Sequence, residues 1–348
     1  MIREFLDDKA AMNLDGSSIL VTGGTGSFGR EFTLQVLKRF NPRRLIIFSR
    51  DELKQWEMQQ DPRFAEHDCV RFFIGDVRDA ERVRMAMRDV DYVVHAAAMK
   101  QVPTAEYNPF ECIRTNIYGA EAVATAAMQA GVKRVIALST DKAASPINLY
   151  GASKLASDKI FIAANNMSGR GGTRFSVVRY GNVMGSRGSV VSIFRKLIAE
   201  NTGVLPITDP RMTRFFIEIR QGSAFVLSCL DKMEGGEVFV PKIPSVRIGD
   251  LARWMAPDFE QKIVGIRPGE KLHETLIGEY EARTTLDMGD RYVIQPALSW
   301  WKGNRYQDEG NRAVDDSFVY SSDSNEEWLS EIDMRRMLGR LYDVPVAA

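Results

Sequence analysis

The chain has 348 residues, 45% of them hydrophobic and 26% charged, and 46 lysines and arginines balance 46 aspartates and glutamates. Nucleic-acid binding normally requires a basic excess for phosphate contacts, so this balance argues against a nucleic-acid partner. The length allows a large core and about two domains, or one large α/β domain with a smaller lobe.

Short apolar runs alternate with longer helical stretches from residue 17 to about residue 182, which is the pattern of parallel βαβ units. The predicted strands are Ser18–Thr22, Arg44–Phe48, Val70–Ile74, Asp91–Ala97, Arg134–Ser139 and Phe175–Tyr180. The predicted helices include Arg30–Arg39, Ala80–Met87, Asn116–Ala130 and Tyr150–Asn165. The expected fold class is α/β, with a Rossmann-like doubly wound parallel sheet and a smaller C-terminal substrate-binding lobe.

Proline and glycine punctuate shorter elements after residue 182, which indicates an irregular lobe. We expect an N-terminal extension at 1–16, a Rossmann domain that binds NADP at 17–182, and mainly a substrate-binding lobe at 183–348. The run at 237–241 predicts one strand that returns to the Rossmann sheet.

The cysteines and the N-terminal residues indicate the cellular compartment. Cys69, Cys112 and Cys229 lack the CxxC spacing of a zinc site or redox pair, and predict reduced core thiols. Charges at 7–9 interrupt any signal peptide, and no apolar run approaches the roughly 18 residues of a membrane span. We therefore expect a cytoplasmic protein with no membrane partner, and we identify no metal site.

A glycine-rich loop, Thr22-Gly-Gly-Thr-Gly-Ser-Phe-Gly29, lies between the first predicted strand and a helix, which is the context of a dinucleotide fingerprint. The sequence fits both GxGxxG and GxxGxxG, and a tight structural turn is the alternative interpretation. Glycines let backbone N–H groups approach a pyrophosphate at the helix N-terminus. The predicted contacts in this loop are Gly23, Thr25, Gly26, Ser27, Phe28 and Gly29.

The second predicted strand ends in Ser49-Arg50, where an NAD protein usually has an acidic residue for the ribose hydroxyls. A guanidinium beside a hydroxyl suits a 2′-phosphate, so we predict NADP rather than NAD. The alternative is a surface ion pair of Arg50 with Asp51 or Glu52. Asp76 is predicted to accept a hydrogen bond from the adenine amino group, and its alternative role is to cap the next helix.

Thr140-Asp141-Lys142 follows the strand Arg134–Ser139, and Tyr150 and Lys154 stand at i and i+4 on one face of a predicted helix. An ammonium near a phenol favours the phenolate, so Lys154 is predicted to lower the pKa of Tyr150. These five residues form the predicted catalytic group.

Longer motifs extend beyond these features: Ser49-Arg-Asp-Glu-Leu-Lys54, Phe73-Ile-Gly-Asp-Val-Arg-Asp79, Ala96-Ala-Ala-Met-Lys100, Arg179-Tyr-Gly-Asn-Val-Met-Gly-Ser-Arg-Gly-Ser189 and Arg267-Pro-Gly-Glu-Lys-Leu-His273. With them the chain resembles an extended short-chain dehydrogenase/reductase, and more narrowly the inverting UDP-N-acetylglucosamine 4,6-dehydratases of the pseudaminic acid pathway. Asp141-Lys142 is the pair of the inverting class, and Tyr150 favours the pseudaminic-type branch.

The resemblance implies further residues that contact the cofactor and others that contact the substrate. Lys100 follows small residues that leave room for the nicotinamide ribose, and a surface lysine is the alternative interpretation. The further cofactor contacts implied are Asp51, Lys54, Val77, Ala96, Lys100, Asn116, Tyr150 and Lys154. The substrate contacts implied are Lys100, Asn182, Ser189, Val190, Arg214 and Arg267.

The implied reaction begins when Tyr150, as phenolate, takes the C4 hydroxyl proton and hydride passes to the nicotinamide, with Thr140 and Lys154 orienting the groups. Neutral Lys142 then removes the C5 proton while protonated Asp141 donates to the departing C6 hydroxyl. Hydride returns to C6, and protonation of the opposite face of C5 gives UDP-2-acetamido-2,6-dideoxy-β-L-arabino-hexos-4-ulose. This would be the first step towards pseudaminic acid or a related surface-glycan sugar. Burial of Asp141 beside Lys142 would instead favour their ion pair, and a plain salt bridge is the alternative.

Two other functions stay open. A nucleotide-sugar 4-epimerase shares the fold and the YxxxK motif but does not need Asp141 and Lys142, whereas a non-catalytic NADP-binding sensor needs neither Tyr150 nor Lys154. The family also implies a homo-oligomer, a dimer or a higher assembly up to a hexamer.

Overall fold

The computed structural model describes residues 5, 12–169, 171–186, 188–297 and 305–342. Most of the expected extension at 1–16 lies outside the described residues. The six predicted strands are present as β1 (Ser18–Thr22), β2 (Arg44–Ser49), β3 (Val70–Ile74), β4 (Tyr92–His95), β5 (Arg134–Thr140) and β6 (Arg174–Tyr180).

Within the described residues, the main sheet has ten strands in the order β16-β14-β15-β10-β6-β5-β4-β1-β2-β3. Strands β1 to β6 and β10 (Val238–Pro241) run parallel. The order 3-2-1-4-5-6 is that of a Rossmann fold, and it reverses between β1 and β4, where such sheets open a crevice for ligands. The predicted fold class is confirmed.

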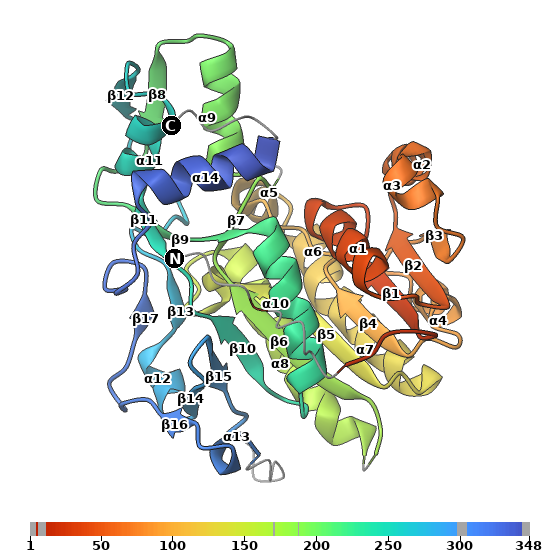
Figure 1. Ribbon diagram of the computed structural model, residues 1–348. Helices are drawn as coiled ribbons and strands as arrows, with labels where there is room; N and C mark the ends of the chain where they lie inside the picture. The colour runs from red at the N-terminus through yellow and green to blue at the C-terminus, as the bar shows by residue number, and fades with distance from the viewer. Residues whose placement is uncertain (1–4, 6–11, 170, 187, 298–304, 343–348) are drawn as a thin grey trace.

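The last third of the chain contributes more to this sheet than its sequence predicts. Beyond β10, the sheet continues through the antiparallel strands β15 (Arg291–Ile294), β14 (Thr285–Asp287) and β16 (Arg312–Ala313). Figure 1 shows these strands below the lobe, in blue. Strands of two to four residues are too short to show an alternating pattern, so the sequence gives no sign of them.

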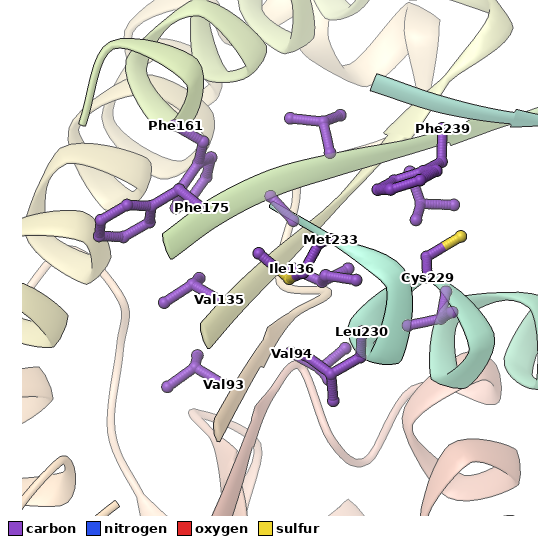
Figure 2. Close-up of a cluster of buried hydrophobic side chains, with 14 of the residues drawn as sticks. Val93, Val94, Val135, Ile136, Phe161, Phe175, Cys229, Leu230, Met233 and Phe239 are labelled. Carbon is purple, nitrogen blue, oxygen red and sulfur yellow. The ribbon is translucent and has the colours of Figure 1, made fainter. Parts of the chain in front are cut away.

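Helices cover both faces of the sheet. They are α1 (Ser27–Arg39), α2 (Glu52–Gln60), α3 (Pro62–Ala65), α4 (Ala80–Ala86), α5 (Val102–Tyr107), α6 (Pro109–Ile113), α7 (Gly119–Ala130), α8 (Leu149–Ser168) and α10 (Ile219–Lys232). Successive residues of a strand point to opposite faces. Figure 2 shows Val93 and Val135 on the face that α8 covers, and Val94 and Ile136 on the face that α10 covers, all of them buried.

The lobe stands apart from the main sheet in Figure 1, with its own core that includes Val191, Phe194 and Leu251. Its elements are β7 (Asn182–Met184), α9 (Val190–Ala199), β8 (Val204–Ile207), β9 (Thr213–Glu218), β11 (Ser245–Arg247), α11 (Ile248–Met255), β12 (Glu260–Ile263) and α14 (Glu331–Tyr342). The remaining short elements are β13 (Thr275–Ile277), α12 (Glu279–Ala282), α13 (Arg305–Asp308) and β17 (Tyr320–Ser321). None of the described helices is long and apolar enough to cross a membrane.

Candidate active site

A cavity of about 780 Å³ runs along the ends of β1, β2, β4 and β5 and continues into the lobe. It forms here because the loops that follow parallel strands all leave the sheet at one edge. All the predicted site residues except Asn116 line this cavity, although they come from segments that are far apart in the sequence.

The glycine-rich loop makes its turn at Gly23, which has a φ of +65°. A Cβ on Gly23 would lie 2.8 Å from the backbone nitrogen of Ala97, and one on Gly29 would lie 2.5 Å from the backbone of Gly24. A Cβ on Gly24 would be equally crowded, 2.8 Å from the Ile47 side chain, so both glycine patterns are sterically required and the positive φ alone assigns the turn to Gly23. Gly26 caps α1, whose first turn lines the cavity and leaves N–H groups for an anion.

The residues after β2 surround the far end of the cavity. The Thr25 and Ser49 hydroxyls are 2.8 Å apart. The Arg50 side chain is 66% exposed, and its Nη1 lies 3.6 Å from Asp76 Oδ2. Asp76 is thus an acidic neighbour of Arg50, while Asp51, one of the two partners that the sequence suggested for Arg50, caps α2 and pairs with Lys54.

Asp76 is not the cap of the next helix. Asp79 takes that role by accepting a hydrogen bond from the backbone N–H of Arg82. Burial would raise the pKa of Asp76, but hydrogen bonds from Arg78 and the charge of Arg50 bring it below its usual value. Asp76 is thus an ionised acceptor at the wall of the cavity.

The strand β5 leads into a 3₁₀ turn, η2 (Asp141–Ala143), which places the Asp-Lys pair inside the cavity. The Thr140 hydroxyl donates to Asp141 Oδ1 at 2.9 Å, and Lys142 Nζ donates to the same oxygen at 3.0 Å. Lys142 Nζ also lies 3.0 Å from Glu274 Oε1.

These contacts determine the charge of Lys142 in the ligand-free protein. Burial alone would lower the pKa of Lys142, but Asp141 and Glu274 raise it above its usual value. In the ligand-free protein Lys142 is therefore held as an ammonium, because Asp141 and Glu274 at 3.0 Å outweigh its desolvation, and the neutral lysine expected for the elimination step stays a prediction. The sequence alternative, an ion pair, describes this state.

Tyr150 lies in the first turn of α8, beside the Asp-Lys pair. Burial raises the pKa of Tyr150 to about 12, while the charge of Lys142 and a hydrogen bond with Thr140 oppose that rise. The sequence predicted that Lys154 lowers the pKa of Tyr150, whereas in the ligand-free protein Lys142 is the cation with the main lowering effect and burial outweighs it. Burial lowers the pKa of Lys154 itself, and Asp158, four residues on, opposes this.

Asn116 is the predicted cofactor contact that the structure places elsewhere. Its buried amide binds the backbone N–H and C=O of Met99 at 2.8 and 3.0 Å and donates to the Ser153 hydroxyl at 2.9 Å. It lies in a π-helical turn, η1 (Arg114–Tyr118), at the start of α7, which turns it away from the cavity. Asn116 therefore fixes the backbone of Met99, the residue before Lys100, by two hydrogen bonds.

The predicted substrate residues form the lobe side of the cavity. Asn182 is in β7, Ser189 caps α9, and Arg267 lies in the loop before β13. Arg214 in β9 is 6% exposed, and its guanidinium donates to the backbone oxygens of Thr213, Lys271 and Leu272. Arg214 is thus a buried, fixed cation and not a solvated loop arginine.

Sequence reasoning missed Glu274, which is 1% exposed and forms part of the wall opposite Asp141. It follows directly after the motif Arg267–His273, so extending that motif by one residue would have found it. Sequence reasoning also missed Lys271, whose Nζ donates to the backbone oxygen of Ala144 at 2.7 Å.

The walls of the cavity fit a dinucleotide. The glycine-rich loop lines the cavity together with the N-terminal turn of α1, which leaves backbone N–H groups for a pyrophosphate, and the exposed Arg50 lines the same cavity. The part of the chain that the structure describes contains no group of three or more histidine, cysteine or acidic residues arranged for a metal ion.

Comparison with known proteins assigns the family. Residues 19–296 match the family described as polysaccharide biosynthesis protein. A UDP-N-acetylglucosamine 4,6-dehydratase (inverting) from Campylobacter jejuni is 55% identical over 326 residues, which cover 92% of this chain and 96% of that protein. A UDP-glucose 4-epimerase from Rickettsia bellii is 44% identical over 285 residues, which cover 80% and 82%.

A solved structure is similar over nearly the whole chain. The X-ray structure of Pen from Bacillus thuringiensis has a TM-score of 0.86 and 34% identity, and the match covers 94% of this chain and 99% of that one. The resemblance stated from the motifs is confirmed. The chain belongs to the polysaccharide biosynthesis protein family, together with the inverting UDP-N-acetylglucosamine 4,6-dehydratases.

Proposed function

We propose that the protein is a lyase that dehydrates UDP-N-acetylglucosamine across C5 and C6 with inversion at C5. The observation that carries this proposal is the Asp141–Lys142 pair beside Thr140 and Tyr150 in one cavity. A 4-epimerase needs a group that oxidises C4 but no acid and base for elimination. The similarity to the Campylobacter jejuni dehydratase supports the same activity.

We propose NADP as the cofactor, held by the glycine-rich loop and by Ser49 and Arg50. The exposed guanidinium of Arg50 supports NADP over NAD because it is the cation available for a 2′-phosphate at the end of β2. Bound there, the nicotinamide would accept hydride from C4 of the sugar and return it to C6.

A chain of hydrogen bonds supplies the acid. Tyr150 is neutral at working pH, and its hydroxyl is hydrogen-bonded to Thr140, which donates to Asp141. A proton leaving the C4 hydroxyl can therefore pass through Tyr150 and Thr140 to Asp141. Asp141 Oδ2 is buried without a hydrogen-bond partner among the described residues, and in our proposal this carboxyl gives the proton to the departing C6 hydroxyl.

The same step prepares the base. Once Asp141 is protonated, Lys142 loses one of its two counter-charges, which makes its ammonium a stronger acid. Neutral Lys142 then takes the C5 proton, which the 4-ketone has made acidic. Return of a proton to the opposite face of C5 sets the L configuration of UDP-2-acetamido-2,6-dideoxy-β-L-arabino-hexos-4-ulose.

We further propose that this product enters the synthesis of pseudaminic acid or a related surface-glycan sugar in the cytoplasm. A homo-oligomer, paired through the long helices α7 and α8, is the expected assembly. The domain limits at residues 182 and 183 stay a prediction.

Incubation with UDP-N-acetylglucosamine in D2O, followed by NMR of the sugar, tests the function. We expect loss of water, deuterium at C5 and an L-configured ring. Lys142→Ala should lose dehydration while still binding cofactor. A bare C4 epimer or unchanged substrate would refute the proposal, and near-normal turnover by Lys142→Ala would show that the C5 base is elsewhere.

A further inference from the structure

Glu274 stands at the inner wall of the cavity, directly before β13, which packs against η2. Its Oε1 lies 3.0 Å from Lys142 Nζ and 3.8 Å from Arg214 Nε. Its Oε2 is buried and has no hydrogen-bond partner among the described residues. Burying a carboxylate oxygen without a hydrogen-bond partner destabilises the folded protein, so a purely structural role does not explain Glu274.

The charged and titratable groups that the described residues place around Lys142 come from several segments. Asp141 contacts it from its own turn, Glu274 from the segment before β13, and Tyr150 from α8. Arg214 in β9 and Lys271 are two further cations of the cluster, and their charges oppose the positive charge of Lys142. The ligand-free cluster therefore keeps Lys142 as an ammonium, yet the chemistry needs it as an amine.

The proposed reaction must store two protons at once. One comes from the C4 hydroxyl and reaches Asp141 through Tyr150 and Thr140. The other leaves the Lys142 ammonium before that nitrogen can attack C5–H. Asp141 cannot hold both, and among the described residues Glu274 is the other carboxylate within 3.0 Å of Lys142 Nζ.

We propose that Glu274 is the proton acceptor that converts Lys142 from ammonium to amine in each turnover. This assignment rests on the proposed function. The N–H bond of Lys142 breaks as an O–H bond forms on Glu274. The amine then takes the C5 proton as the C6–O bond breaks and Asp141 protonates the leaving oxygen.

The cycle closes without an outside co-reactant beyond the proposed cofactor. After C6 has been reduced, the Lys142 ammonium returns a proton to C5 and becomes an amine. Glu274 then gives its stored proton back to Lys142. Each residue ends in the protonation state in which it began.

Glu274→Gln tests the assignment because it keeps the shape and removes the proton acceptor. Without it, Lys142 must release its proton to solvent through its partly exposed side chain. We expect dehydration to be roughly a hundredfold slower at about pH 7. The rate should rise about tenfold per pH unit, since only neutral Lys142 reacts, whereas the wild-type rate stays flat over the same range.

Two matched variants keep this result interpretable. Glu274→Asp retains a carboxylate and should restore a flat pH profile, even at a lower rate. Glu279→Gln removes the same charge at an exposed position in α12, outside the cavity, and should behave as wild type. Single-turnover reduction of bound cofactor, which reports oxidation at C4, should change by less than about threefold in Glu274→Gln.

Three outcomes would overturn the assignment. A wild-type rate and a flat profile in Glu274→Gln would show that Lys142 uses another acceptor. Equal loss of C4 oxidation and dehydration would show that Glu274 only holds the site together. If the wild-type protein itself fails to dehydrate UDP-N-acetylglucosamine, the proposed function is refuted, and so is the role of Glu274 as proton acceptor.

Discussion

Arg50→Ala should reduce the preference of the protein for NADP over NAD. The Arg50 guanidinium projects from the end of β2, at the wall of the cavity, with Asp76 as its nearest anionic partner at 3.6 Å. Asp76 stays held by Arg78 at 2.7 Å, so removing Arg50 leaves the wall intact. The variant should therefore lose its contact with the 2′-phosphate and little else.

The size of this effect follows from the exposure of the side chain. A hydrogen bond to a charged group contributes about 1.5–3 kcal/mol. Because Arg50 is 66% exposed, solvent screens the contact, and the lower figure applies. About 1.5 kcal/mol corresponds to a roughly tenfold weaker Kd for NADP. The Kd for NAD, which lacks the phosphate, should change by less than about twofold.

Titration calorimetry with both cofactors at two salt concentrations measures this difference. Arg63→Ala is a matched control, because its side chain is 65% exposed, pairs with Asp61 and lies outside the cavity. The tenfold loss should shrink at high salt. Equal weakening of NADP and NAD binding, or no change in either, would refute the assignment of Arg50 to the 2′-phosphate.

Two further predictions concern stability. Gly23→Ala should lower the free energy of unfolding by more than about 2 kcal/mol and abolish cofactor binding, because its φ of +65° and a 2.8 Å approach to Ala97 admit no Cβ. Urea unfolding checks this, and a wild-type midpoint would contradict the reading of the turn. Burial and the charge of Lys154 lower the pKa of His95 from 6.5 to about 3, so below pH 6.5 the unfolded chain takes up a proton that the folded protein refuses. The contribution of neutral His95 to the free energy of unfolding is therefore complete above about pH 6.5. It is lost as the pH falls, by about 2 kcal/mol at about pH 5. The free energy of unfolding of His95→Gln, measured by urea unfolding at several pH values, should lack this fall. The same pH dependence in wild type and His95→Gln would show that another group controls the loss.

The glycine-rich loop and the strands around it were predictable because their signals are local. A strand such as Ser18–Thr22 is apolar throughout, and the loop after it carries the glycines that its turn requires. Motif-by-motif resemblance then placed Arg214 and Arg267 in the lobe, and both line the cavity.

Asn116 and Glu274 show where such reasoning stops. Asn116 was predicted to contact the cofactor, but its amide binds the backbone of Met99 instead. Glu274 was not predicted at all, although its carboxylate contacts Lys142. The orientation of Asn116 depends on a π-helical turn, which residue spacing does not reveal. Glu274 reaches Lys142 only because β13 packs against η2 across more than a hundred residues of sequence.

The sequence alone therefore determined the fold class, the family and the list of reacting side chains, since these follow from apolar periodicity and from residue types at fixed spacing. Tertiary structure alone decided which form each side chain takes. Lys142 stays an ammonium despite its burial because Asp141 and Glu274, from different segments, each lie 3.0 Å from its nitrogen, and burial raises the pKa of Tyr150 to about 12, which opposes formation of the phenolate. Protonation depends on burial and on charges a few ångströms away in space, and distance along the chain carries no information about either.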